Sequence, residues 1–216
     1  MKNVKTTDDL HLRASPNGDI IGLLPKGSVE AVSEQSGDWL HISTGWISAT
    51  YVEDAVPSFW HMPLPEIYFA KTSQSYLNYD PSLYKQFGYH TGVDYGGRGQ
   101  TNIPLLACAD GEIVYSQIAD SPWGKFLGNH AAIYIPAVDK SFLYCHMAAA
   151  PYSVGQIKAG DQIGIMGNTG QSAGGAIHLH LEGFHRRFVI AWRSFLSVDD
   201  IKGKTFDADQ FIRAHL

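Results

Sequence analysis

Several features that typify nucleic-acid-binding, membrane-spanning or disulfide-stapled proteins are scarce in this chain. Its 216 residues include only two cysteines, carry a net charge of −5 and contain no run of Lys or Arg. No apolar stretch approaches the ~20 residues that cross a bilayer as a helix. These absences argue against nucleic acid as a partner, a transmembrane segment, and a structural zinc site built from Cys-x-x-Cys pairs. The hydrophobic content of 44% is that of an ordinary globular protein with a core.

The two cysteines and the first residues bear on the cellular compartment. Cys108 and Cys145 could form one disulfide in an oxidising compartment, or be two small buried apolar side chains, and the second interpretation is favoured. The opening sequence MKNVKTTDDLHLRASPNG has two early lysines but lacks the apolar core of a secretory signal. We therefore expect either export by another route or a leader that was removed.

Short turn signals punctuate the whole chain and favour an all-β fold. Motifs such as SPNGD, PKGS, GGRGQ, KAGD and NTGQ separate segments rich in Val, Ile, Tyr and Phe, among them GEIVYSQIA and SFLYCHM. Short strands between Gly, Pro, Asn and Asp turns indicate antiparallel sheets. Helical periodicity is confined to the edges of the chain, notably DADQFIRAHL at the C-terminus, where Asp207 or Asp209 is the expected N-cap of a short helix.

A stretch with several prolines divides the chain. The segment DAVPSFWHMPLPEIY holds three prolines, which remove backbone donors and disfavour a central strand. We expect a small β module over residues 1–56, a proline-containing linker and lead-in over 57–80, and a larger β domain with a C-terminal tail over 81–216. No internal repeat is visible.

The signals in the first module follow a specific order. A strand with an arginine leads into a Ser-Pro-Asn-Gly turn, and then come IIGLLPKG, a further strand, GDWLHI and finally GWISATYV. This order, from Leu10 to about Glu53, resembles the bacterial SH3-like modules attached to cell-wall enzymes. The resemblance implies a small half-open barrel that binds peptidoglycan or docks on its own catalytic domain. Trp39, Trp46 and Tyr51 are interpreted as core residues, a role favoured over ligand contact for at least one tryptophan.

Two local patterns in the larger domain combine a histidine with a second polar group. His90 and Asp94 lie four residues apart in GYHTGVDYGG, where glycines permit tight turns, and both side chains are competent zinc ligands. In FLYCHMA, strand alternation predicts that Tyr144 and His146 share one face while Cys145 occupies the other. Each pattern alone has an ordinary alternative, a turn capped by aspartate for the first and a hydrogen-bonded core histidine for the second.

A third pattern, AIHLHLEGF, is a stronger signal. Residues i and i+2 of a strand point to the same side, so His178, His180 and Glu182 would share one face. Leu179 and Leu181 would occupy the other face, toward the core. The two imidazoles would lie roughly 6.5–7 Å apart along the strand. This spacing permits either that both ligate one zinc ion or that one ligates while the other works as an acid or base.

Taken in order, the three patterns closely resemble the lysostaphin-type zinc endopeptidases of bacterial cell walls. The resemblance runs from about Tyr89 to Gly183 and includes the glycine-punctuated segment GDQIGIMGNTGQSAGGAIHLH, which is highly specific. It implies one zinc ion per chain and hydrolysis of a cross-link or stem peptide of peptidoglycan, at the cell wall in the periplasm or outside the cell. The zinc ligands that it implies are His90, Asp94 and His180.

The resemblance also bears on the other polar residues. It implies that His146 and His178 form a catalytic pair, and we expect Tyr144 to add a hydrogen bond to the tetrahedral intermediate. His130 is expected to be structural or to line the rim. Glu182 shares the histidine face, but the implied ligand set leaves it a role beside a ligand or toward solvent rather than on the metal.

Departures from the family pattern and several alternatives accompany this interpretation, and the strand NHAAIYIPA lacks the His-Gly turn often seen at its end in the family. The family often has GPHLHFE where this chain has GGAIHLHLE, a change that bears on substrate fit. All five implied positions are occupied, which argues against a wall-binding or regulatory protein that no longer cuts. A zinc lyase or hydrolase of small molecules is disfavoured, because an SH3-like module implies a polymeric substrate. No residue selects between a Gly–Gly bond and a bond next to a D-amino acid, and none predicts the oligomeric state.

Overall fold

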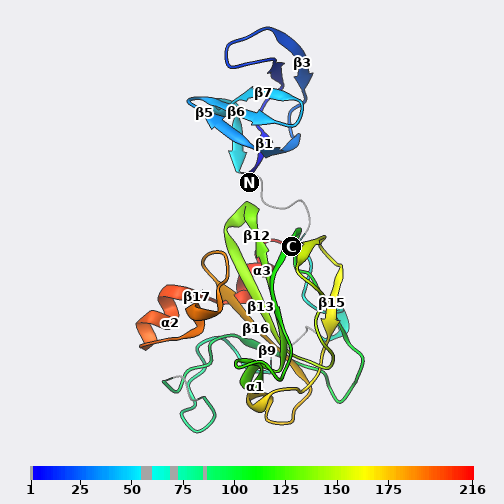
Figure 1. Cartoon of the computed structure of the whole chain (residues 1–216), viewed down its shortest axis with the longest axis vertical. Coiled ribbons are helices and arrows are strands. Elements are labelled where there is room, and N and C mark those ends of the chain that lie inside the picture. The colour runs from blue at the N-terminus through cyan, green and yellow to red at the C-terminus, as the bar shows by residue number, and fades with distance from the viewer. Residues whose placement is uncertain (1, 55–59, 69–72, 85–86) are drawn as a thin grey trace. The chain divides into compact units, whose positions relative to one another are not determined.

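The computed structural model describes residues 2–54, 60–68, 73–84 and 87–216 (Figure 1). Strands dominate, they pair antiparallel, and the helices are short, which confirms the predicted all-β class. The chain forms two compact units, one built mainly from residues 1–58 and the other from most of the remaining residues. In the described ranges, no helix combines the length and the apolar character needed to cross a membrane.

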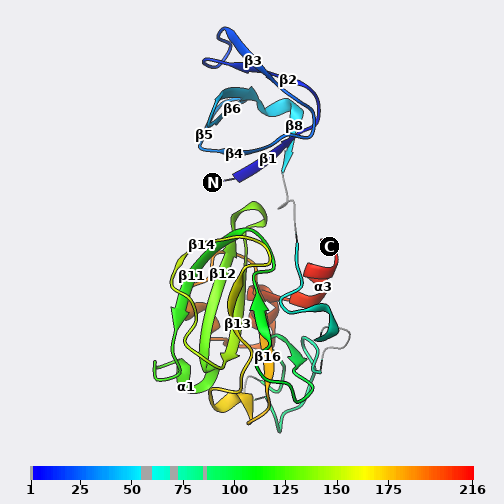
Figure 2. The ribbon, with the colours of Figure 1, turned by 90° about the vertical axis from the view of Figure 1, so that its right-hand side faces the viewer.

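The smaller unit consists of two antiparallel sheets (Figure 2). One sheet has the strand order β4-β1-β8 and the other the order β3-β2-β7-β6-β5. The elements are short because turns rich in Gly, Pro, Asn and Asp interrupt them. Their bounds are β1 (Lys2–Thr6), β2 (Leu10–Arg13), β3 (Ile20–Leu24), β4 (Val29–Val32), β5 (Glu34–Ser36), β6 (Trp39–Ile42), β7 (Gly45–Ser48), η1 (Ala49–Tyr51) and β8 (Val52–Asp54).

The core of the smaller unit is aliphatic. It contains Val4, Leu10, Val32, Leu40, Ile42 and Ile47. Trp39 and Trp46 are only half-buried, and Tyr51 is 50% exposed. The expected aromatic core is therefore wrong, because alternation along β6 turns Leu40 and Ile42 inward and leaves Trp39 on the outer face. The half-open barrel implied by the SH3-like resemblance stays a prediction.

A seven-stranded antiparallel sheet dominates the larger unit. Its strand order is β14-β11-β12-β13-β16-β17, and β9 also pairs with β16. Strands β10 and β15 form a separate pair. The bounds are η2 (Glu66–Tyr68), β9 (Val93–Gly96), β10 (Pro104–Leu106), β11 (Gly111–Gln117), α1 (Gly124–Leu127), β12 (Asn129–Ile135), η3 (Pro136–Val138), β13 (Lys140–Met147), β14 (Gly155–Ile157), β15 (Gln162–Ile165), η4 (Gln171–Ala173), β16 (His178–Phe184), η5 (Ile190–Arg193), α2 (Val198–Lys204), β17 (Thr205–Phe206) and α3 (Ala208–Arg213).

Strand β16 lies inside this sheet and is buried along its whole length. It pairs with β13 along one edge and with β9 and β17 along the other. Leu179 and Leu181 are fully buried, as predicted for the apolar face. The face that carries the histidines is buried as well, so its polar side chains must find partners inside the protein.

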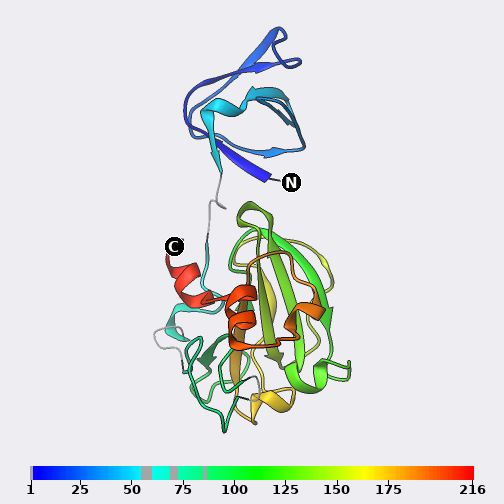
Figure 3. The ribbon, with the colours of Figure 1, turned by 90° about the vertical axis from the view of Figure 1, so that its left-hand side faces the viewer.

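The C-terminal segment covers part of the histidine face of the sheet (Figure 3). Phe188, Phe195 and Ile201 belong to one apolar cluster with Phe184 of β16 and with residues of β12 and β13. Cys145 lies in the same cluster. Both cysteines of the chain are buried and unpaired, which confirms the favoured interpretation.

The predicted C-terminal helix is confirmed as α3. Asp207 is its N-cap, since its side chain accepts a hydrogen bond from the backbone N–H of Gln210 at 3.0 Å. Asp209, the alternative cap, instead accepts hydrogen bonds from Tyr95 and Arg213. The cap therefore satisfies a backbone donor of the first turn that has no partner within the helix.

The segment expected as linker and lead-in, 57–80, lies in the larger unit over its described residues. Trp60, Met62 and Leu64 are buried there. The backbone N–H of Leu106 donates to the carbonyl oxygen of Pro63, which fixes this extended segment beside β10. The first proline of the segment, Pro57, lies outside the described residues.

The apolar cluster under the C-terminal segment predicts a cost for truncating Ile201, which is fully buried in α2. Ile201→Ala should lower the free energy of unfolding by about 2–5 kcal/mol, because it removes buried methyl groups and leaves a cavity. Leu196→Ala, at a side chain that is 81% exposed, is the matched control and should change it by less than about 0.5 kcal/mol. Urea unfolding of the full chain measures both. Equally small losses would contradict a core role for this segment.

Candidate functional site

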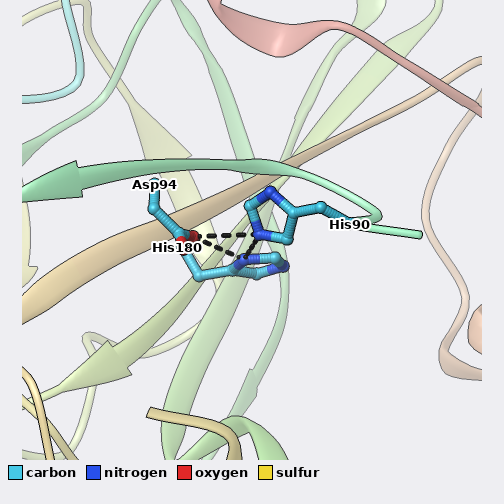
Figure 4. Close-up of side chains that lie close together, drawn as sticks. All are labelled: His90, Asp94 and His180. Carbon is cyan, nitrogen blue, oxygen red and sulfur yellow. Dashed lines mark hydrogen bonds and ion pairs between the residues drawn. The ribbon is translucent and has the colours of Figure 1, made fainter. Parts of the chain in front are cut away.

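The larger unit brings His90 and Asp94 against His180 of β16. In the pairing of β9 with β16, Asp94 lies directly opposite His180. Directly opposite residues in an antiparallel pair share one face, so the carboxylate and the imidazole meet. His90 lies in the turn before β9, where its backbone pairs with that of Leu77 and Asn78. Figure 4 shows the three side chains pointing toward one another.

The three side chains place their ligand atoms around one point. Nε2 of His90 lies 3.0 Å from Nδ1 of His180, and Oδ1 of Asp94 lies 3.2 and 2.8 Å from these two nitrogens. A tetrahedral zinc site with bonds of about 2.0–2.2 Å separates its ligand atoms by roughly 3.3–3.6 Å. The three ligand atoms would therefore have to move apart only slightly to bind a zinc ion. Its two imidazoles and one carboxylate are a donor set that zinc takes.

A glycine allows the close approach of β9 to β16. A Cβ atom on Gly92 would lie 2.4 Å from the carbonyl oxygen of Leu181, a distance that real Cβ atoms do not reach. Any side chain here would push the two strands apart and separate Asp94 from His180. The glycine in the His-Thr-Gly-Val-Asp sequence is thus part of the reason that these two residues meet.

The outer nitrogen of each of the two cluster histidines, His90 and His180, is held by a hydrogen-bond acceptor. Nδ1 of His90 donates to the carbonyl oxygen of Ser75 at 3.0 Å, which leaves Nε2 to face the cluster. His180 is turned the other way, with Nε2 donating to Oε1 of Glu182 at 3.0 Å and Nδ1 facing the cluster. Such bonds fix the tautomer and the orientation of a metal-binding ring.

Two further histidines border the cluster in the same manner. Nδ1 of His178 donates to the carbonyl oxygen of Ala176 at 2.9 Å, and Nδ1 of His146 donates to that of Thr169 at 2.8 Å. In the neutral ring each Nε2 is thereby left as an acceptor. The centroid of the His146 ring lies 4.8 Å from that of His178 and 5.9 Å from that of His180. The structure thus brings together the four histidines and the aspartate that the sequence singles out.

His146 reaches this cluster through an irregularity in β13. The pairing of β12 with β13 shifts register between Asn129 and Ala131, which inserts an extra residue in β13, and His146 has a φ of +64°. Such a bulge re-aims a side chain and is common beside active sites. The prediction that Tyr144 and His146 share a face is therefore wrong, because regular alternation ends before His146.

Tyr144 lies in the core and has a different partner from the predicted one. It is paired with Leu181 and so shares the apolar face of the sheet. Its side chain is fully buried, and its hydroxyl donates to the carbonyl oxygen of Leu106 at 3.0 Å. Burial raises the pKa of this hydroxyl well above its usual value. These contacts favour a structural role for Tyr144 over a hydrogen bond to a reaction intermediate.

The charges around His180 favour a cation at the cluster. Burial alone disfavours a charged ring, but the hydrogen bonds to Asp94 and Glu182 outweigh it and raise the pKa of His180 to about 9. Burial likewise opposes ionisation of Asp94, yet its contacts with His180 and His90 hold the pKa of its carboxyl well below the usual range. A positive charge is therefore stabilised here, whether it is a proton on His180 or a metal ion between the three ligand atoms.

The pKa values of the two bordering histidines, His146 and His178, are lowered, whereas that of His180 is raised. Burial, with a smaller effect from His180 and His178, lowers the pKa of His146 to about 3. Burial also lowers the pKa of His178, although the charge of Asp94 opposes the shift. Both rings are therefore neutral at physiological pH, with Nδ1 protonated and a lone pair on Nε2, and Nε2 of His178 lies 3.9 Å from Oδ1 of Asp94. A lone pair of this kind is what a general base requires.

Sequence patterns missed three residues beside the site. Arg193 and Thr91 both hydrogen-bond the buried carboxylate of Glu182, so Glu182 lies beside His180 and away from solvent. The ring of Tyr84 stacks on that of His90, with centroids 4.7 Å apart and planes 22° apart. Thr91 lies within the motif of His90 and Asp94, but its contact with Glu182 is made across to β16. Tyr84 and Arg193 come from other segments, which no spacing rule connects to the histidine motifs.

His130 stands apart from the cluster. It is fully buried, its Nδ1 donates to the carbonyl oxygen of Gly128 at 2.7 Å, and its ring lies 5.5 Å from that of Tyr115. Burial lowers its pKa. Of the two expected roles, structural or rim-lining, the burial favours the structural one.

Comparison with known proteins finds a family model that matches the part of the chain that carries these residues. The model of the family described as Peptidase family M23 matches residues 88–188, a span that holds the four histidines and the aspartate. The DD-carboxypeptidase/endopeptidase Mpg of Neisseria meningitidis is 33% identical over 122 residues, which cover 49% of this chain and 26% of that protein. The chain thus corresponds to about a quarter of the length of this curated relative.

Solved structures share the fold of the larger unit. The catalytic domain of the antimicrobial peptidase lysostaphin from Staphylococcus simulans is similar with a TM-score of 0.50 at 24% identity, covering 68% of this chain and 93% of that one. A further structure of lysostaphin gives a TM-score of 0.53 at 23% identity, covering 74% of this chain and 56% of that one. At these identities the likeness shows a common fold.

The hydrogen bond of Tyr144 predicts a loss of stability for Tyr144→Phe. The variant should lower the free energy of unfolding by about 1–3 kcal/mol, because the carbonyl oxygen of Leu106 loses its buried donor. Tyr134→Phe removes an exposed hydroxyl contact to Asp139 and is the matched control, with an expected change below about 0.5 kcal/mol. Urea unfolding compares the two. Unchanged stability together with a large loss of activity would instead restore the catalytic role.

Proposed function

Residues 88–188 belong to Peptidase family M23, and from this premise we propose that the chain is a zinc-dependent endopeptidase that hydrolyses peptides of bacterial peptidoglycan. The family and the Neisseria relative support a peptidoglycan hydrolase. The observation that carries the proposal in this chain is the geometry of the site. Three convergent ligand atoms lie beside two neutral histidines whose Nδ1 atoms are anchored and whose Nε2 atoms are thereby left as acceptors.

His90, Asp94 and His180 are the residues that would hold zinc. Three protein ligands leave a fourth position open, which distinguishes catalytic from structural zinc sites. When bound, zinc supplies Lewis acidity, lowering the pKa of a water ligand and polarising a carbonyl group. The nearly complete burial of the three side chains strengthens their hold on a cation, because little water competes for its charge.

His146 and His178 are the proposed proton carriers. Each presents an unprotonated Nε2, so either ring can accept a proton from the attacking water. The other ring can hydrogen-bond the oxygen on which negative charge develops, or deliver a proton to the leaving amine. Their fixed Nδ1–H bonds keep both rings oriented while Nε2 gains and loses its proton.

The smaller unit supplies the proposed contact with the wall. A hollow of about 280 Å³ on this unit is lined by residues that include Asp9, Arg13, Trp39 and Tyr51. The guanidinium of Arg13 lies 5.7 Å from the centroid of the Trp39 ring. A polymeric peptide with exposed charges and amide planes matches this mixture of aromatic and charged groups. The proposed site of action is accordingly the cell wall, in the periplasm or outside the cell.

Removal of a zinc ligand should abolish metal binding and activity together. His90→Ala and His180→Ala each remove one of three protein ligands, so zinc measured by atomic absorption should fall from about one per chain to near zero. A zymogram on purified walls should lose its cleared band in both variants and in wild type treated with a chelator. His185→Ala, at an exposed histidine, is the control and should keep both. Clearing that survives complete removal of zinc would contradict the proposal.

Removal of either bordering histidine should lower the catalytic rate and leave the zinc content unchanged. His146→Ala and His178→Ala should reduce the turnover of wall peptides by about 10²–10⁴-fold, the usual contribution of a positioned acid or base. Zinc content should stay at the wild-type value. Loss of zinc from His178→Ala would mean that this residue is a ligand, and the roles of His178 and His180 would have to be reassigned.

The proposed wall contact predicts weaker retention when its aromatic rings are removed. Full chains with Trp39→Ala or Tyr51→Ala should elute earlier than wild type from immobilised purified walls, since each loses a ring that lines the hollow. Leu23→Ala, at a side chain that is exposed but outside the hollow, is the control. Retention of both variants equal to that of wild type would place the wall contact elsewhere.

A further inference from the structure

Arg193 and Glu182 form a buried ion pair behind the ligand histidine His180. Nε of Arg193 donates to Oε2 of Glu182 at 2.8 Å, and Nη2 donates to Oε1 at 2.6 Å. Glu182 is fully buried and Arg193 is 8% exposed. This bidentate arrangement is the one in which a guanidinium fixes the plane of a carboxylate.

Oε1 of Glu182 has three partners. Besides Nη2 of Arg193, it accepts Nε2–H of His180 at 3.0 Å and the hydroxyl of Thr91. Nη2 of Arg193 also lies 3.4 Å from Oγ1 of Thr91, as a donor. The carboxylate cannot turn without breaking several of these bonds. The carboxylate is therefore held on the side of the His180 ring that faces away from the cluster, and the direction of its hydrogen bond to this ring is fixed.

Stability alone does not account for this ion pair. Taking two charges out of water costs several kcal/mol per ion, and replacing a buried pair by apolar side chains of similar volume is often neutral or stabilising. Glu182 shares one face of β16 with Phe184, a member of the apolar cluster under the C-terminal segment, so apolar side chains would suit this position. A pair that the core does not need, attached to a residue of the site, points to a role in the site.

We infer that Arg193 is a positioning residue of the zinc site, which acts through Glu182 on His180. The inference rests on the proposed function, because it concerns the binding of zinc by His180 and its two partners. With Glu182 held, Nε2 of His180 keeps its hydrogen bond and Nδ1 stays directed at His90 and Asp94. A ring released from this bond can rotate and withdraw Nδ1 from the other two ligand atoms.

The place of Arg193 in the chain makes it an unexpected member of the site. It ends the short helix η5, beyond residue 188, where the family match stops. Its guanidinium makes two bonds to the carboxylate and one to Thr91, and the single ammonium of a lysine cannot reproduce this planar fork. The C-terminal segment thus contributes a polar group to the site as well as apolar cover.

Zinc affinity of the full chain tests this role without reference to activity. Wild type and variants, freed of metal, compete for zinc with a chromophoric chelator, and urea unfolding of the metal-free proteins is measured beside it. The decisive variant is Glu182→Met/Arg193→Met, which removes both charges and leaves no unpaired ion in the core. Arg193→Lys keeps the charge without the fork. Arg187→Met breaks a bidentate but exposed pair with Glu112 and is the matched control.

We expect the double variant to fold with near wild-type stability and to bind zinc about 10–100-fold more weakly, the usual effect of losing an outer partner of a ligand histidine. Arg187→Met should match wild type. Wild-type zinc affinity in a folded double variant would overturn the inference, and so would an equal loss in Arg187→Met. If the double variant does not fold, Arg193→Lys becomes the deciding variant. Weaker zinc binding at unchanged stability would support the inference, and unchanged zinc binding would overturn it.

The outcomes also separate this inference from the proposed function. A wild-type chain that binds no zinc would overturn the zinc-dependent function and, with it, the role of Arg193. A wild-type chain that binds zinc and clears walls, with a double variant that binds zinc equally well, would overturn only the positioning role.

Discussion

Every imidazole in the site is held at the nitrogen that faces away from the cluster. The acceptors are the carbonyl oxygens of Ser75, Thr169 and Ala176 and the carboxylate of Glu182. A ring held at one nitrogen presents the other along a fixed direction, as a lone pair for a metal or for a proton. Glu182 lies on β16, whereas Ser75, Thr169 and Ala176 lie outside the strands, so the connecting segments place three of the four acceptors.

Much of this arrangement follows from short-range rules. Period-two alternation predicts that His178 and His180 share one face of a strand whose leucines enter the core, and β16 has this form. The fold class follows in the same way from turn residues and short β-branched segments, and the end of the chain follows from the cap formed by Asp207. The meeting of His90 and Asp94 with β16 is non-local, and only the resemblance to a known family predicted it.

Each failure of prediction has its own physical cause. Alternation assigns His146 to the face of Tyr144, but a bulge and a positive φ turn it to the other histidines. Alternation within β6 likewise leaves Trp39 on the outside of the smaller unit, where aromatic size alone had favoured the core. Arg193 gives no signal, because its contact with Glu182 is made in space by a short helix with no periodic pattern.

The ion pair of Arg193 with Glu182 has a consequence for where the catalytic unit ends. A fragment that stopped at residue 188, the end of the family match, would retain every residue proposed to bind metal or to move protons. It would nevertheless leave the carboxylate of Glu182 without its arginine partner, and its sheet would lose the apolar cover that Phe195 and Ile201 provide. The smallest piece of this chain expected to keep the proposed site intact therefore extends at least through α2, well past residue 188, where the family match ends.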